Sequence, residues 1–101
     1  MIRFKHGVLI SGVRPEIAMA INVAHAVYQD YGYDLIVTSV MDGVHSEKSL
    51  HYEGLAVDLR TRHIQNEHIN EIVSDLKEHL TEEFQIILED SHCHVEFDPE
   101  T

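Results

Sequence analysis

The spacing of apolar residues changes from helical to extended and back along this chain, and that order limits the folds it can adopt. Residues 15–31 and 66–79 carry apolar side chains every three or four positions, which is the period of an amphipathic helix. Four short segments are β-branched or alternate apolar with polar residues, as strands do: 35–40, 55–59, 84–88 and 92–97. Residues 2–10 predict a short edge strand with glycine breakers.

This order of helix, strand, strand, helix and hairpin is typical of an α+β sandwich. We therefore expect residues 1–101 to form a single small α+β domain, with two helices packed on one face of a mainly antiparallel sheet. Pro15 suits the first position of the first helix, and Gly32 is a plausible stop. Asn66 is expected to cap the second helix.

The charge of the chain excludes several classes of function. Eighteen acidic and seven basic residues give a formal net charge of -11, which argues against nucleic-acid and anionic-membrane partners. We find neither a signal peptide nor an apolar run that could span a membrane, so we expect synthesis in the cytoplasm. The single cysteine, Cys93, excludes an internal disulfide.

Nine histidines in 101 residues are unusual, and histidine is a common zinc ligand and acid-base group. Enrichment alone is weak evidence, so position has to decide. His63, His68 and His79 lie at or on the second predicted helix among acids, and we expect them on the solvated surface.

Asp58 is the first candidate for a functional site. Its apolar neighbours on the predicted strand point into the core, so Asp58 points to the opposite face. An aspartate flanked by apolar residues is costly to desolvate without a partner. A cation shared with His51, from the preceding loop, is one partner; the alternative is that Arg60 or Arg62 pairs with Asp58.

The second candidate is the last predicted strand, on which His92, His94 and Glu96 share one face. Such a face suits a metal cleft, and the alternative is an ordinary exposed polar face. Cys93 falls on the core side and is expected to be a buried small hydrophobe rather than a ligand or nucleophile.

Together these segments offer His51, His94 and Asp58 as ligands, with a fourth position open. Three protein ligands and an open position are typical of catalytic zinc. A nearby carboxylate must take and return a proton, and Glu89 and Asp90, at the turn before the last strand, are the candidates.

The pattern Ser49-x-His51-x-x-Gly54-x-Ala56-x-Asp58, followed by His92-x-His94, resembles the D-Ala-D-Ala carboxypeptidase and L,D-endopeptidase family of zinc peptidases. The stretch from His45 to Asp58 is similar to the signalling domain of hedgehog proteins, which shares that fold and zinc site. The likeness covers roughly residues 14–97. It implies one zinc ion on His51, Asp58 and His94, with His45 and His92 supporting the site or the transition state.

Three departures from these families change the expectation. The loop at residues 38–43 keeps only Asp42 of the hedgehog calcium cluster, so a calcium site is not expected. The glutamate base of the family maps onto Glu89 with one residue fewer before the last ligand, which leaves Asp90 as a rival. Residues 39–42 contain no arginine for a substrate carboxylate, which favours an endopeptidase over a carboxypeptidase.

The resemblance implies a zinc metallopeptidase that cleaves peptidoglycan stem or cross-link peptides next to a D-amino acid. A phage endolysin or a bacterial wall enzyme, acting on the cell wall once a lysis system releases it, is one such enzyme, and a cytoplasmic dipeptidase is another. We expect a monomer in which Glu89 carries the proton and His92 or His45 donates to the developing oxyanion. The alternative is a non-catalytic, zinc-containing hedgehog-like module that binds other proteins.

Overall fold

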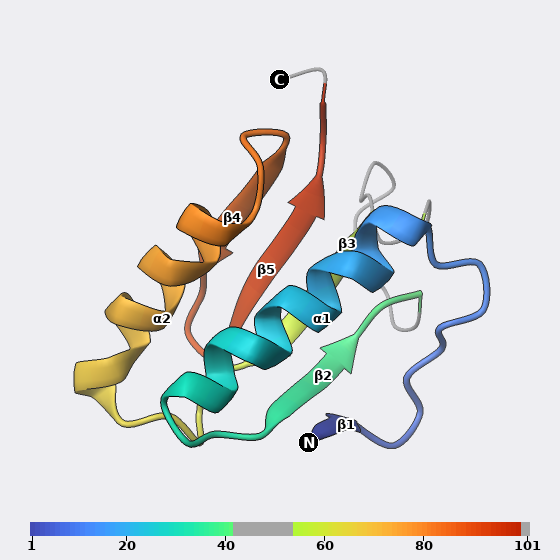
Figure 1. The fold of residues 1–101 in the computed structure, drawn as a ribbon. Helices are drawn as coiled ribbons and strands as arrows, with labels where there is room; N and C mark the ends of the chain where they lie inside the picture. Colours follow the sequence, from blue (N-terminus) through green and yellow to red (C-terminus); the bar gives the residue numbers. More distant parts are fainter. Residues whose placement is uncertain (42–53, 100–101) are drawn as a thin grey trace.

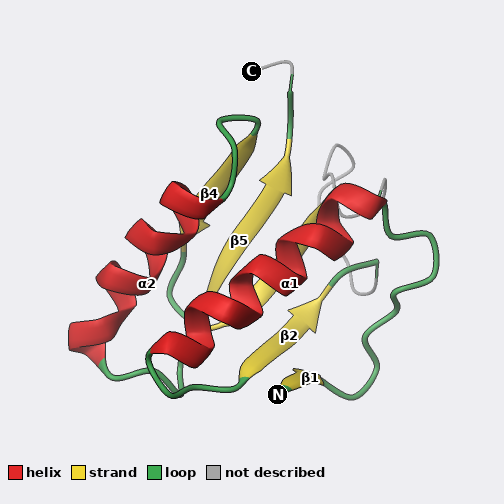
Figure 2. Cartoon of the chain, in the orientation of Figure 1, coloured by secondary structure: helices red, strands yellow, loops and turns green. Residues whose placement is uncertain are grey.

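The structure, a computed structural model, describes residues 1–41 and 54–99. They form five strands and two helices (Figures 1 and 2). In chain order these are β1 (Ile2–Phe4), α1 (Pro15–Asp30), β2 (Leu35–Ser39), β3 (Ala56–Arg60), α2 (Asn66–His79), β4 (Phe84–Leu88) and β5 (His92–Phe97).

The five strands form one sheet in the order β1-β2-β3-β5-β4. β1 runs parallel to β2, and the other three pairings are antiparallel. Both helices cross the same face of this sheet, and no helix of the described residues covers the opposite face (Figures 1 and 2). The α+β prediction, with two helices on one face of a mainly antiparallel sheet, is confirmed.

The core lies between the helices and the covered face of the sheet. The apolar stripe predicted for α1 is buried there, and its buried members are Ile17, Ala20, Ile21, Ala24, Val27 and Tyr28. Tyr28 is fully buried, and its hydroxyl donates a hydrogen bond of 2.9 Å to the backbone oxygen of Arg60. This bond ties α1 to the end of β3, the strand that carries Asp58.

Two local expectations about the ends of elements were wrong. β1 stops at Phe4 instead of extending to residue 10, because the chain turns at Gly7, where φ is +89° and the Val8 amide donates to the Lys5 oxygen. Asn66 does not cap α2: it lies within the helix, the capping residue is Gln65, and no side chain bonds the helix amides. The backbone of Gln65 leaves the helical region one residue before the position we expected.

Two histidines expected on the solvated surface are half-buried instead. The Nε2 atom of His63 lies 2.8 Å from the backbone oxygen of Asp34, and the Nδ1 atom of His68 lies 2.8 Å from the Tyr33 hydroxyl. The ring of Tyr33 is 6.0 Å from that of His63 and 5.8 Å from that of His68. These histidines help to pack the helices, whereas His79 is exposed as expected.

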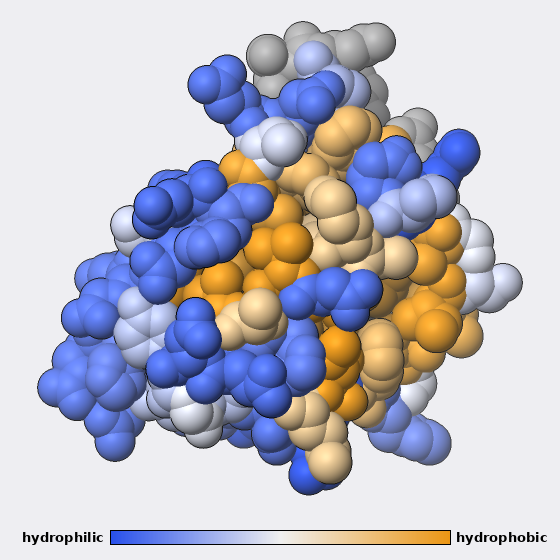
Figure 3. All heavy atoms as spheres, in the orientation of Figure 1, coloured by the Kyte–Doolittle hydropathy of each residue, from blue (hydrophilic) through white to orange (hydrophobic). Residues whose placement is uncertain are grey.

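The face with the helices is unevenly polar. Hydrophilic residues dominate the side of α2, and apolar residues gather between the helices and toward α1 (Figure 3). In the described part of the chain, no helix combines the length and the apolar character needed to cross a membrane.

Gly54, in the segment that leads into β3, has a backbone conformation and surroundings that favour glycine. Its φ is +73°, a region that other L residues enter at a cost of about 1–2 kcal/mol. A Cβ here would overlap the carbonyl oxygen of Gly12 and lie 3.1 Å from the Cα of Val13. The Gly54 oxygen also accepts a 2.9 Å hydrogen bond from the Arg14 amide, so the start of α1 is held against this segment.

We predict that Gly54→Ala destabilises the protein more than Gly32→Ala, although both glycines have positive φ. Gly32 has nothing within 4 Å of an added Cβ, so its substitution should cost only the conformational strain of about 1–2 kcal/mol. Gly54→Ala should cost about 1–3 kcal/mol more, because backbone atoms must move apart. Urea unfolding of both variants measures the difference, and equal losses would show that the contact with Gly12 is unimportant.

Candidate metal and proton-transfer site

The register between β3 and β5 places Asp58 directly opposite His94. Val57 and Leu59, the neighbours of Asp58, are buried in the core at 1% exposure. The side chain of Asp58 therefore lies on the face without helices, as the alternation of the strand predicted. There it is buried to 12% exposure, and its Oδ1 atom is 2.8 Å from the Nδ1 atom of His94.

His94 lies between two carboxylates. Its Nδ1 atom contacts Asp58 and its Nε2 atom is 2.8 Å from Oε1 of Glu96, two residues further along β5. An imidazole that donates to two carboxylates at once carries both ring protons. The hydrogen bond to Asp58 raises the pKa of His94, with a further contribution from Glu96 that burial opposes.

This arrangement sets a competition at His94 between a proton and a metal ion. Metal ligands must be deprotonated, so a cation at the Asp58–His94 pair would displace a proton from the ring. The Glu96 contact fits such a cation, because a metal-bound histidine commonly donates its other ring N–H to a carboxylate. A carboxylate and an imidazole nitrogen facing each other are a donor set that suits zinc.

His92 extends the cluster along β5. Its Nε2 atom lies 3.8 Å from Oδ1 of Asp58 and 3.7 Å from Oε2 of Glu89. Its Nδ1 atom is 3.2 Å from the Ser91 hydroxyl, which orients the ring. Glu89 is half exposed at 50%, so its carboxylate meets both solvent and the histidine. Of the two rival bases, Glu89 faces this cluster, whereas Asp90 is exposed and makes no contact with either histidine.

The neighbouring strand supports the position of Asp58. The pairing of β2 with β3 shifts between Val37 and Ser39, so Thr38 is an extra residue on β2. The Thr38 hydroxyl donates a 3.3 Å hydrogen bond to the backbone oxygen of Asp58. Such bulges are common beside functional sites, where they redirect side chains.

The other predicted site residues divide into those that the structure describes and those that it does not. His51 and His45 lie outside the described residues. Within residues 1–41 and 54–99, no group of three or more His, Cys, Asp or Glu side chains is placed to hold a metal ion. The alternative in which Arg60 or Arg62 pairs with Asp58 is wrong, since the acid pairs with His94 and neither arginine contacts it.

Several residues of this region were not assigned a role from the sequence. Glu96 was placed on the correct face, but its contact with His94 depends on the side-chain conformations of both residues. Thr38 was missed because the bulge has no clear sequence signal. Two arginines considered only as partners of Asp58 lie instead in a neighbouring pocket, described below.

Comparisons of the chain with models of known protein families, with curated proteins and with solved structures found no match. The likeness to zinc peptidases and hedgehog domains therefore depends on the motif residues alone.

We predict that Cys93 does not react in the folded protein. It is 1% exposed on the core side of β5, and burial, with the nearby charge of Asp58, raises the pKa of its thiol to about 12. Because the thiolate is the reactive form, a maleimide at pH 7.5 should leave the native protein unlabelled and label it fully in denaturant. Mass spectrometry counts the adducts, and rapid labelling of the native protein would show that this strand opens.

Proposed function

We propose that this chain is a zinc-dependent peptidase acting on peptidoglycan stem or cross-link peptides next to a D-amino acid. The observation that supports it best is the Asp58–His94 pair, 2.8 Å apart on the face without helices, with Glu96 behind the histidine. The sequence motif adds His51 as the third ligand. Zinc with three protein ligands polarises a carbonyl group and activates water at neutral pH.

The side chains around this pair suit the remaining steps. Glu89 is open to solvent on one side and near His92 on the other, so it can accept a proton from water and return it to the leaving amine. His92 is close enough to Asp58 to lie beside the reacting carbonyl, where its N–H can donate to the developing oxyanion. His45 is the other candidate for this donor, from the sequence alone.

The choice between endopeptidase and carboxypeptidase depends on where the substrate carries its charge. Residues 39–42 provide no arginine for a terminal carboxylate after the central strand, which favours cleavage inside the stem or cross-link.

One observation favours a second function, a zinc-containing binding module without turnover. Both ring nitrogens of His94 already have carboxylate partners, so the cluster is satisfied as a static polar network. A buried charged network of this kind can serve to specify structure rather than chemistry. The next two experiments separate these functions.

We predict that the protein binds one zinc ion per chain and that binding depends on Asp58. At a thousand-fold excess over the dissociation constant, zinc should stabilise the native state by about 4 kcal/mol, which calorimetry detects as a higher Tm. Asp58→Asn should abolish most of this increase. Asp90→Asn is the matched control, because it makes the same chemical change at an exposed acid.

The comparison uses the increase in Tm caused by zinc in each variant, since Asp58→Asn also weakens the pair with His94 and lowers the baseline. Elemental analysis of protein purified without a chelating column gives the stoichiometry. A chain that cannot be loaded with zinc, or an equal zinc effect in both variants, would contradict the proposed site.

We predict that Glu89→Gln keeps its zinc and loses activity by about 10²–10⁴-fold, the usual contribution of a general acid-base group. Asp90→Asn should retain activity because Asp90 makes no contact with the histidines. The substrates are purified sacculi and free stem peptides, and mass spectrometry identifies the new termini.

New amino termini inside the stem or cross-link would support the endopeptidase. Release of terminal D-Ala alone would show that the chain is a carboxypeptidase. A zinc-loaded protein that cleaves none of these peptides would favour the binding module, and a larger loss in Asp90→Asn than in Glu89→Gln would move the base to Asp90.

A further inference from the structure

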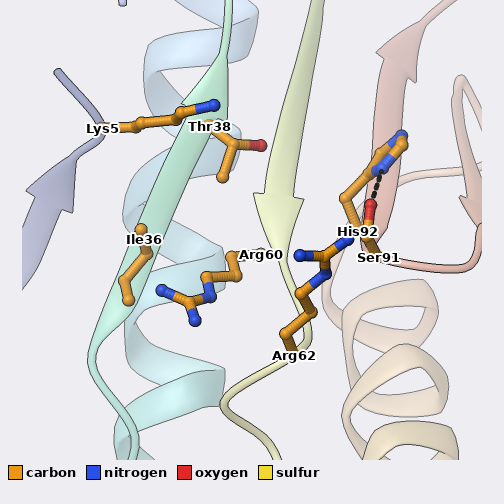
Figure 4. Close-up of a pocket in the computed structure, with 7 residues that line it drawn as sticks. All are labelled: Lys5, Ile36, Thr38, Arg60, Arg62, Ser91 and His92. Atoms are coloured by element: carbon orange, nitrogen blue, oxygen red, sulfur yellow. Dashed lines mark hydrogen bonds between the residues drawn. The ribbon is translucent and has the colours of Figure 1, made fainter.

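A pocket of about 570 Å³ lies on the same sheet face as the Asp58–His94 pair. Figure 4 shows its residues in front of the strands, with α1 behind the sheet. The described residues that line it come from β2, from the ends of β3 and β5, and from the segments next to β1, β3 and β5. They are Lys5, Ile36, Thr38, Arg60, Arg62, Ser91 and His92.

The charge of this pocket is opposite to that of the chain. Three of the seven basic residues of the sequence line it, namely Lys5, Arg60 and Arg62, and none of the 18 acidic residues is among its described lining. Within the described part of the chain, these three side chains form no ion pair with a carboxylate. Three like charges around one hollow repel each other, and an anion between them would relieve that repulsion.

The remaining lining residues suit an oxyanion. Arginine presents a planar fork of N–H donors that matches a carboxylate or a phosphate in two-point contact. Ser91 adds a hydroxyl to the lining and His92 adds an imidazole ring, whereas the Thr38 hydroxyl already donates to the backbone oxygen of Asp58. In Figure 4 the Lys5 side chain extends toward Thr38, and the Ser91 hydroxyl is joined to the His92 ring by a hydrogen bond.

The pocket adjoins the candidate zinc site through His92. His92 lines it and also lies 3.8 Å from Asp58, measured from Nε2 to Oδ1. In the β3–β5 ladder, Arg60 pairs with His92 two positions along from the Asp58–His94 pair. A ligand in the pocket would therefore extend toward the proposed zinc ligands.

We propose that this pocket binds an internal carboxylate of the peptide substrate, not the carboxyl terminus, and so positions a peptide bond within the stem or cross-link at the zinc site. The inference rests on the proposed peptidase function. A carboxylate and a phosphate share the chemistry that the arginines recognise, but 570 Å³ is the size of sites that hold small organic molecules rather than a bare ion. Arg60, at the end of β3, and Arg62, just after it, thus serve as substrate-positioning residues for a carboxylate inside the stem, which agrees with cleavage inside the stem or cross-link.

The test measures binding without catalysis, on the full chain freed of zinc and then of chelator, since chelators are themselves carboxylates. The first probe is an N-acetylated stem peptide that is amidated at its carboxyl terminus and keeps one free internal carboxylate. The second is the same peptide with that carboxylate as its amide, and the third is inorganic phosphate. Amide NMR spectra at low, fixed ionic strength report both the affinity and the residues affected.

The free acid should shift the signals of Arg60, Ser91 and His92 and bind about tenfold more tightly than the amide, as expected for a charged hydrogen bond. Arg60→Gln and Arg62→Gln should each weaken binding of the acid by about tenfold and leave binding of the amide unchanged. Lys77→Gln is the matched control, because it removes one positive charge from an exposed site on α2. Arg60→Lys, which keeps the charge and loses the fork, should fall between wild type and Arg60→Gln.

These variants should fold, because Arg60 and Arg62 are exposed and the Tyr28 bond uses the Arg60 backbone; thermal melting checks this. Equal binding of acid and amide, or equal losses in Arg60→Gln and Lys77→Gln, would overturn the proposal. The proposal would also be overturned if phosphate shifted the NMR signals of these residues and the peptide acid did not. If the chain binds the carboxylate but never takes up zinc, the proposal of a carboxylate-binding pocket stands and only the proposal of a zinc peptidase is refuted.

Discussion

Backbone hydrogen bonds between β3 and β5 hold Asp58 opposite His94, and every other feature of the polar face is arranged around that pairing. A shift of one residue in this register would point the polar side chains of the site into the core and the core side chains toward solvent. The same ladder places Arg60 beside His92, so one register positions both the acid–histidine cluster and the basic pocket. Val57, on the opposite side of β3, anchors the register by its burial in the core.

Both helices pack on one face of the sheet, and the candidate site lies on the other face, which no helix of the described residues covers. The hydrogen bond from the Tyr28 hydroxyl to the backbone oxygen of Arg60 fixes the end of β3 relative to α1. On the uncovered face, Asp58 is buried by its own neighbours and needs a partner in that low dielectric. His94 is that partner, 2.8 Å away, and a zinc ion bound by both residues would be another.

Charge is distributed on this face in two zones. Toward one end of β5 lie the carboxylates of Asp58 and Glu96, which attract a cation. Toward the start of β5 lie Arg60 and Arg62, which attract an anion. A peptide with a carboxylate near its scissile bond has the complementary order of groups, with a carbonyl for the metal and a negative charge for the arginines. This local positive zone contrasts with the overall charge of -11.

The sequence by itself determined the elements, the fold class and the faces of the strands, because these follow from the short-range periods of apolar residues. It therefore placed Asp58, His92 and His94 on one face and Cys93 in the core. It did not determine which residues meet across the ladder, since register depends on contacts between segments 36 residues apart in the chain. Only the tertiary structure decided that Glu96 contacts His94 and that Glu89 rather than Asp90 faces His92. For the same reason, the basic pocket could not be predicted from the sequence, because its lining residues come from segments at β1, β2, β3 and β5 that are far apart in the chain.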